Sequence, residues 1–141
     1  MKSRKKQPEK DTGKICGMQT LLIVLSAFLA DRITKTAVIL SIKHSPLKIL
    51  GDFFGFEYLE NTGAAFSIFR GNNALLLWLY IIIIGIIIYV FPSIKNKKLN
   101  VPLAIVLGGI IGNLFDRIFL GYVVDFVKIS VWPAFNIADS C

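Results

Sequence analysis

Residues 75–91 form an uninterrupted apolar run without a charged side chain. Leu, Ile, Trp, Tyr, Val and Phe fill every position of the run except Gly85. A helix of about this length crosses a hydrocarbon core of roughly 30 Å. A helix at the surface of a soluble domain, in contrast, is apolar along one stripe only. The run therefore predicts a membrane-spanning helix and argues against a soluble fold.

Two more apolar blocks flank this run. The predicted spans cover residues 15–35, 74–91 and 101–120. Pro92 ends the second span, and Pro102 fits the first turn of the third, where a missing N–H costs nothing. Gly108, Gly109 and Gly112 leave the third span without side chains along part of its length, so a neighbouring helix or an acyl chain can approach closely. The chain is thus expected to be a mainly α, polytopic membrane protein.

The first block needs a separate argument because it follows a basic start, as the apolar region of a secretory signal peptide does. It continues past Ala30 to Ile42 without a small-residue cleavage site of the A-x-A type. We therefore interpret it as a retained span, with a helix that extends as far as residue 42.

The charge distribution predicts the orientation of these spans. The net charge is +7, and Lys and Arg gather in residues 1–14 and 93–100. Short basic segments beside membrane spans favour the cytoplasmic side. Residues 43–71 and 121–138 are then extracytoplasmic. A nucleic-acid ligand is excluded, since no basic stripe with interleaved aromatic residues occurs.

The chain divides into a basic cytoplasmic tail, residues 1–14, and one membrane domain, residues 15–141. Within that domain, residues 43–71 mix glycines with aromatic and β-branched residues, which predicts short strands at the bilayer interface. Cys16 and Cys141 lie far apart and His44 is the only histidine. This pattern predicts no disulfide scaffold, no metal site and no cofactor.

Charged residues near the spans are candidates for function, because a charge in a bilayer needs a partner or a role. Asp31 and Lys35 are four residues apart and are expected to pair on one helical face. Asp116 and Arg117 are adjacent, so each should reach a different partner. Asn113 shares the face of Asp116. A purely structural network that holds helices together is an equally good reading of this second group.

Asp125 and Asp139 differ from these because each follows apolar residues without a basic neighbour in sequence. If they meet, burial and mutual repulsion raise their pKa values, and the pair shares a proton. One carboxylate can then activate a water while the other donates a proton to the scissile peptide. The alternative from spacing alone is an interfacial aspartate and a helix N-cap.

Five segments resemble, in order, the signature blocks of the lipoprotein signal peptidases (signal peptidase II). They are residues 31–35, 61–67, 108–117, 121–126 and 132–139. The resemblance implies a transmembrane helix bundle of four helices with a small extracytoplasmic β-cradle. Three spans are present here, and the family's fourth would follow residue 139.

The resemblance also implies an activity. Members of this family are aspartic endopeptidases of the bacterial cell (inner) membrane. They remove signal peptides from diacylglyceryl-modified prolipoproteins and cleave before the lipid-bearing cysteine. The family pattern assigns the catalytic dyad to Asp125 and Asp139. The matching substrate-binding or supporting residues are Asn61, Gly63, Asn113, Asp116, Arg117 and Asn136. The expected partners are the prolipoprotein substrates and membrane lipid, and the expected state is a monomer.

One departure from the family pattern generates further expectations. Only Ser140 and Cys141 follow Asp139, so the domain is expected to be truncated at the start of the fourth helix. Asp139 should then be poorly held, and Asn113 and Asp116 should face lipid. A truncated, non-cleaving membrane relative is therefore the alternative function. An ion path through the aspartates is disfavoured by the lack of internal symmetry, and a presenilin-type protease by the lack of a G-x-G-D block.

Overall fold

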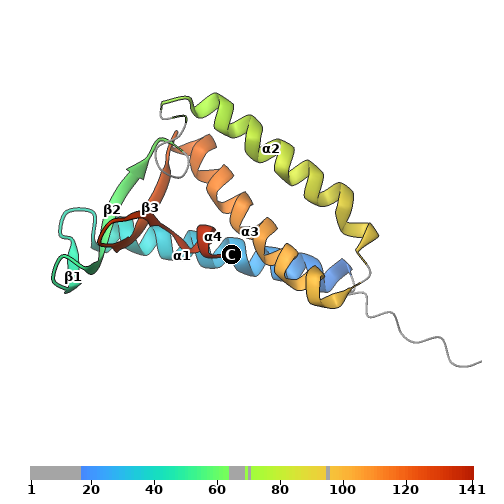
Figure 1. Ribbon diagram of the computed structural model, residues 1–141, viewed down its shortest axis with the longest axis horizontal. Coiled ribbons are helices and arrows are strands. Elements are labelled where there is room, and N and C mark those ends of the chain that lie inside the picture. Colours follow the sequence, from blue (N-terminus) through green and yellow to red (C-terminus); the bar gives the residue numbers. More distant parts are fainter. Residues whose placement is uncertain (1–16, 64–68, 70, 95) are drawn as a thin grey trace, which may run out of the picture.

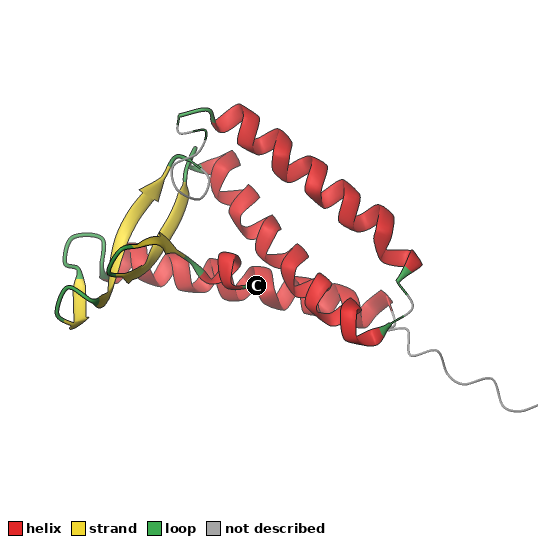
Figure 2. Cartoon of the chain, in the orientation of Figure 1, coloured by secondary structure: helices red, strands yellow, loops and turns green. Residues whose placement is uncertain are grey.

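The computed structural model describes residues 17–63, 69, 71–94 and 96–141. The predicted tail at residues 1–14 and part of the predicted interfacial segment lie outside the described residues. In chain order the elements are α1 (Gly17–Ser41), β1 (Leu47–Leu50), β2 (Phe54–Asn61), α2 (Asn73–Val90), the 3₁₀ helix η2 (Phe91–Ser93), α3 (Lys97–Phe119), β3 (Val123–Ile129), β4 (Trp132–Phe135) and α4 (Ile137–Ser140). The protein is mainly helical with one small antiparallel sheet (Figure 2).

Three long helices form the body of the molecule, and the sheet lies at one end of them (Figure 1). At that end α1 finishes, α2 begins and α3 finishes. The short helix α4 comes back from the sheet and packs on α3 and α1. The segments that follow α1 and α3 therefore converge on the end of the bundle where α2 begins.

Side-chain exposure in the helices is the reverse of that in a soluble protein. In α2 the single buried side chain is Leu76, while Ile82, Ile86 and other large apolar residues are exposed. Two of the described helical segments, Asn73–Ser93 and Lys98–Phe119, are long and apolar enough to cross a membrane. Outward-facing apolar residues at this density match a lipid environment rather than water. The prediction of membrane-length helices is confirmed for these two segments.

Helix α1 shows the same inversion in a sharper form. Its buried residues are Asp31, Lys35 and Val38, whereas Leu22 and Leu29 are exposed. The helix has 25 residues and ends at Ser41, close to the predicted limit at residue 42. Its length and its apolar outer face support the predicted first span, which stays a prediction.

The third helix begins earlier than predicted. Asn96 caps α3, and its Oδ1 accepts a hydrogen bond from the Lys98 amide at 3.0 Å. The helix therefore starts at Lys97, and Pro102 lies inside it rather than in its first turn. The prediction for Pro102 was wrong because it placed the helix start at the edge of the apolar block and not at the capping asparagine.

Glycines in α3 allow the close packing that was predicted. A Cβ at position 108 would lie 2.5 Å from the carbonyl oxygen of Val24 in α1, and one at position 112 would lie 2.5 Å from Oδ2 of Asp31. A Cβ at position 109 would meet the carbonyl oxygen of Ala138 in α4 at 2.6 Å. The close neighbours in the structure are thus other helices of the same chain.

The sheet has the order β1-β2-β3-β4, with every neighbouring pair antiparallel. Strands β1 and β2 confirm the strands predicted in residues 43–71. Strands β3 and β4 lie in a segment for which only a polar character was predicted. In the central pair, Leu59 of β2 stands opposite Asp125 of β3, and Asn61 stands opposite Val123. Asn61 and Asp125 therefore share one face of the sheet.

Candidate active site

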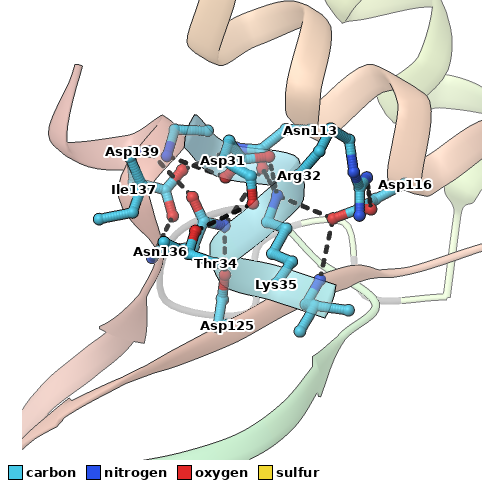
Figure 3. Close-up of polar contacts among 12 residues, drawn as sticks. Asp31, Arg32, Thr34, Lys35, Asn113, Asp116, Asp125, Asn136, Ile137 and Asp139 are labelled. Atoms are coloured by element: carbon cyan, nitrogen blue, oxygen red, sulfur yellow. Dashed lines mark hydrogen bonds and ion pairs between the residues drawn. The ribbon is translucent and has the colours of Figure 1, made fainter. Parts of the chain in front are cut away.

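Much of the interior of this protein is polar. The buried polar or charged side chains among the described residues are Asp31, Lys35, Asn100, Asn113, Asp116, Arg117, Asp125 and Asn136. Where α1, α3, β3 and α4 meet, Figure 3 shows Asp31, Lys35, Asn113, Asp116, Asp125 and Asn136 close together. Buried polar groups are costly unless each is hydrogen-bonded or paired. The concentration of such groups at one junction marks it as the candidate site.

Asp125 lies in β3, and only 2% of its surface is exposed. Its two oxygens each accept a hydrogen bond from a side-chain amide. The Asn136 Nδ2 donates to Oδ1 at 2.7 Å, and the Asn61 Nδ2 donates to Oδ2 at 2.8 Å. The β2–β3 register places Asn61 on the same face as Asp125, so the local sheet geometry sets up this second contact.

Asp139 lies in α4 and is the third residue of that helix. It forms a capping box with Asn136: the Asp139 amide donates to Asn136 Oδ1 at 3.0 Å, and the Asn136 amide donates to Asp139 Oδ2 at 3.2 Å. The Asn113 Nδ2 of α3 donates to Asp139 Oδ1 at 2.9 Å. The prediction of a poorly held Asp139 was wrong, because this cap and α3 fix both carboxylate oxygens.

The two aspartates line one cavity of about 900 Å³. Leu59, Thr62, Tyr80, Trp132 and Phe135 form part of its wall. Burial and, in second place, the nearby charge of Asp139 raise the pKa of Asp125 to about 6. A carboxyl group that titrates near neutrality is suited to proton transfer at physiological pH.

Behind this cavity lies a cluster of four charged side chains from α1 and α3. The Lys35 Nζ lies 2.8 Å from Asp31 Oδ2 and 2.8 Å from Asp116 Oδ2, and Arg32 pairs with the other oxygen of Asp116. The predicted pairing of Asp31 with Lys35 is confirmed. Two cations and two anions leave the cluster neutral, which is how buried charges become tolerable.

The expectation that Asn113 and Asp116 face lipid was wrong. Asn113 is 4% exposed and Asp116 is fully buried. The cationic side chains of Arg32 and Lys35 cover this face of α3 from α1, and α4 covers it from the other side. The face of α3 that was expected to lack a packing partner is covered by Arg32, Lys35 and α4.

Arg117 reaches partners different from those of Asp116, as predicted. Its Nη2 donates to the Gly63 carbonyl oxygen, and its Nη1 lies 3.4 Å from Asn73 Oδ1. The guanidinium also lies over the ring of Tyr80, with 5.7 Å from Cζ to the ring centroid. Sequence reasoning missed Asn73 and Tyr80, because both belong to α2 and neither stands out in or beside its apolar run.

No group of three or more His, Cys, Asp or Glu side chains in metal-binding geometry occurs within the described ranges of the chain. The cavity contains two carboxylates that accept hydrogen bonds from side-chain amides. Such a pair can share a proton and titrate as a unit.

The family model for "Signal peptidase (SPase) II" matches residues 23–141. The lipoprotein signal peptidase of Clostridium novyi is 40% identical over an alignment of 128 residues that covers 84% of this chain and 86% of that protein. The lipoprotein signal peptidase of Caldicellulosiruptor bescii is 38% identical over 118 residues, which are 84% of this chain and 79% of that protein.

The chain belongs to the lipoprotein signal peptidases. A solved bacterial membrane enzyme, determined by the in meso method at 2.3 Å resolution, has the same fold with a TM-score of 0.79 and 27% identity. The similarity covers 91% of this chain and 82% of that one. The resemblance drawn from the five sequence motifs is confirmed, and the protein is a membrane aspartic peptidase of the signal peptidase II type.

In this lipoprotein signal peptidase, the predicted site residues fall into two groups. Those that line the cavity are Asn61, Gly63, Asn113, Arg117, Asp125 and Asp139. Asn136 and Asp116 do not line it: Asn136 bridges the two carboxylates from behind, and Asp116 pairs with Lys35 and Arg32. The family motifs thus include cavity residues and the residues that hold them.

Proposed function

We propose that Asp125 and Asp139 are the catalytic pair of this peptidase. In this proposal the substrate is a prolipoprotein whose cysteine already carries diacylglycerol, and cleavage occurs on the N-terminal side of that cysteine. The observation that carries the proposal is the shared cavity, which is lined by two carboxylates from β3 and α4. The side chains of three asparagines donate hydrogen bonds to these carboxylates: Asn61 and Asn136 to Asp125, and Asn113 to Asp139.

The arrangement supports a metal-independent hydrolysis. A water attacks the carbonyl carbon of the scissile peptide and gives its proton to ionised Asp139, while protonated Asp125 gives its proton to the carbonyl oxygen. The tetrahedral intermediate then collapses: the C–N bond breaks, Asp139 passes a proton to the leaving nitrogen, and Asp125 takes back the proton of the hydroxyl group. The raised pKa of Asp125 favours it as the proton holder.

This assignment predicts a pH dependence. Activity requires protonated Asp125, so kcat/KM should decline as the pH rises through about 6, where Asp125 loses its proton in the free enzyme. Initial rates measured between about pH 4 and pH 9 check this decline. A rate that stays constant up to the alkaline end would contradict the role given to Asp125.

The location of the cavity supports a lipid-modified substrate. The cavity lies where the sheet meets the helices, and its wall includes Tyr80 of α2, a helix whose outer face is apolar. Acyl chains can then lie against the helices while the peptide reaches the carboxylates. The test compares purified peptidase on a prolipoprotein with and without diacylglycerol. Mass spectrometry should find cleavage before the cysteine in the modified form only, and equal cleavage of both forms would contradict the substrate class.

We further propose that the sheet is extracytoplasmic and the loop near residue 96 cytoplasmic. The support is the clustering of Lys and Arg in residues 1–14 and 93–100, together with the convergence of β1–β4 on the opposite end of α2 and α3. A reporter fused after Asn96 should read cytoplasmic, and one inserted after Asp52, in the turn between β1 and β2, should read extracytoplasmic. The reverse pattern would contradict the orientation.

One chain supplies both carboxylates and the asparagines that hydrogen-bond to them, and action as a monomer stays a prediction. Membrane lipid is the expected surrounding partner of the exposed apolar faces of α1 and α2.

A further inference from the structure

Lys35 is fully buried in α1 and does not line the cavity, yet its ammonium group contacts the network that holds the two carboxylates. Its Nζ has three partners: Oδ2 of Asp31, Oδ2 of Asp116 and Oδ1 of Asn113, each at 2.8 Å. The contact with Asn113 is a hydrogen bond, and the two contacts with the carboxylates are ion pairs. Two of the partners neutralise its charge, and the third is an uncharged amide.

The contact with Asn113 determines which way that amide faces. Asn113 Oδ1 accepts from Lys35, and Asn113 Nδ2 donates to Asp139 Oδ1 at 2.9 Å. If the amide were turned over, its NH₂ group would face the ammonium and its oxygen would face the carboxylate. Both of these contacts are repulsive, so a charged Lys35 leaves Asn113 only one orientation, with a donor toward Asp139.

A second amide extends the same constraint to Asp125. Asn136 Nδ2 donates to Asn113 Oδ1 at 3.1 Å and to Asp125 Oδ1 at 2.7 Å. Its two N–H groups are therefore directed toward an oxygen that Lys35 has already fixed and toward the first catalytic carboxylate. Figure 3 shows this chain of contacts running from Lys35 through Asn113 and Asn136 to both aspartates.

We propose that Lys35 is a positioning residue for the cleavage reaction: through the amides of Asn113 and Asn136, it keeps N–H donors directed at Asp139 and Asp125. The inference rests on the proposed function of this aspartate pair. Donors directed at a carboxylate favour its ionised form. Lys35 thereby sets the pH range in which the pair holds a single proton, although its ammonium group does not touch the substrate.

The test removes the ammonium group without leaving an unpaired charge. Lys35→Met with Asp31→Asn takes away one cation and one anion, and the Asn oxygen can still accept from the Ala138 amide, now 3.2 Å from Asp31 Oδ1. Lys35→Gln with Asp31→Asn keeps a neutral donor for Asn113. Lys48→Met with Asp52→Asn is the matched control, because that ion pair has the same spacing but is exposed.

For the Met version we expect kcat to fall by about tenfold or more with KM within about twofold, as for a group that acts on the reacting geometry only. We also expect the pH profile to move upward by on the order of one unit. The Gln version should recover most of kcat and the original profile. The control pair should behave as the unmodified protein.

An equal fall in kcat in the Met and Gln versions, with an unchanged pH profile, would overturn the inference, since Lys35 would then contribute to packing only. If the Met version fails to fold, the Gln version decides alone: a displaced pH profile would overturn the inference, and an unchanged profile with near-normal kcat would support it. Asp125→Asn and Asp139→Asn are assayed beside these variants. If they stay active, the proposed pair fails; if they are inactive while the Lys35 variants are normal, only the role of Lys35 fails.

Discussion

Asp125→Asn is expected to abolish cleavage and, at the same time, to stabilise the folded peptidase at neutral pH. The loss of activity follows because an amide keeps the shape of the carboxyl group but cannot hold and pass on the proton. The gain in stability follows from burial, which makes the ionised form of Asp125 unfavourable in the folded state.

The direction of the stability change depends on pH. The pKa of Asp125 is about 6 in the folded protein against an ordinary value of 3.8. Between these values the folded state binds more protons than the unfolded state, so the free energy of unfolding falls as the pH rises from about 4 to about 6. Over this pH range the free energy of unfolding falls by on the order of 3 kcal/mol. The Asp125→Asn substitution removes this loss, but it also removes one hydrogen bond from Asn61 or Asn136, which offsets about 1 kcal/mol of the gain.

The measurement combines a cleavage assay with thermal unfolding in detergent. At neutral pH the Asp125→Asn variant should unfold at a temperature roughly 2–6 °C higher than the unmodified protein, and below pH 4 the difference should disappear. Asp139→Asn should also abolish cleavage and serves as the matched control for activity. Near-normal cleavage by Asp125→Asn would show that the catalytic role belongs to another group.

Asp116→Ala should have the largest effect on folding. It removes the anionic partner of Arg32 and one of the two anionic partners of Lys35, and it leaves a net positive charge in a site where Asp116 is fully buried. Breaking one member out of a buried ion network costs about 3–5 kcal/mol, which is a large share of the total stability of about 5–15 kcal/mol in typical proteins. We expect little folded protein in the membrane.

Two variants separate this effect from catalysis. Arg32→Met combined with Asp116→Ala restores neutrality and should recover much of the folded protein. Asp52→Ala removes a carboxylate from an exposed pair and should leave the unfolding temperature unchanged. Protease resistance in membranes and the unfolding temperature in detergent are the measurements. An Asp116→Ala protein that is fully folded but inactive would instead place Asp116 in the catalytic machinery.

The helical part of the fold was predictable because a bilayer leaves few options. An apolar run such as residues 75–91 has to be a helix that satisfies its own backbone. The sheet was predictable only in part: glycines and aromatic residues indicated β1 and β2, whereas β3 and β4 were missed. The run Val123-Val124-Asp125-Phe126-Val127 has the β-branched and aromatic composition of a strand. It was interpreted only as the position of a candidate catalytic carboxylate, so no strand was predicted there.

The candidate site was predictable to the extent that its residues belong to motifs. Local pairings such as Asp31 with Lys35 follow from helical spacing alone. The contact between Lys35 and Asn113 does not, since 78 positions separate the two residues and only helix packing brings them together. Tyr80 illustrates the same limit, because an aromatic residue inside an apolar span carries no sequence sign that its face borders a polar cavity.

Gly109 determines how closely α4 approaches α3. Helix α4 rests on α3 at this glycine, where the Ala138 carbonyl oxygen approaches to within a distance that leaves no room for a methyl group. Asp139 is the next residue along α4. The size of the residue at position 109 of α3 therefore determines how far the carboxylate of Asp139 lies from that of Asp125. A displacement of 1 Å can reduce a rate by about a hundredfold. A side chain at position 109 is therefore expected to shift α4 and to change the separation of Asp125 and Asp139. If these two residues are the catalytic pair as proposed, the rate of cleavage should fall although no ionisable group has changed.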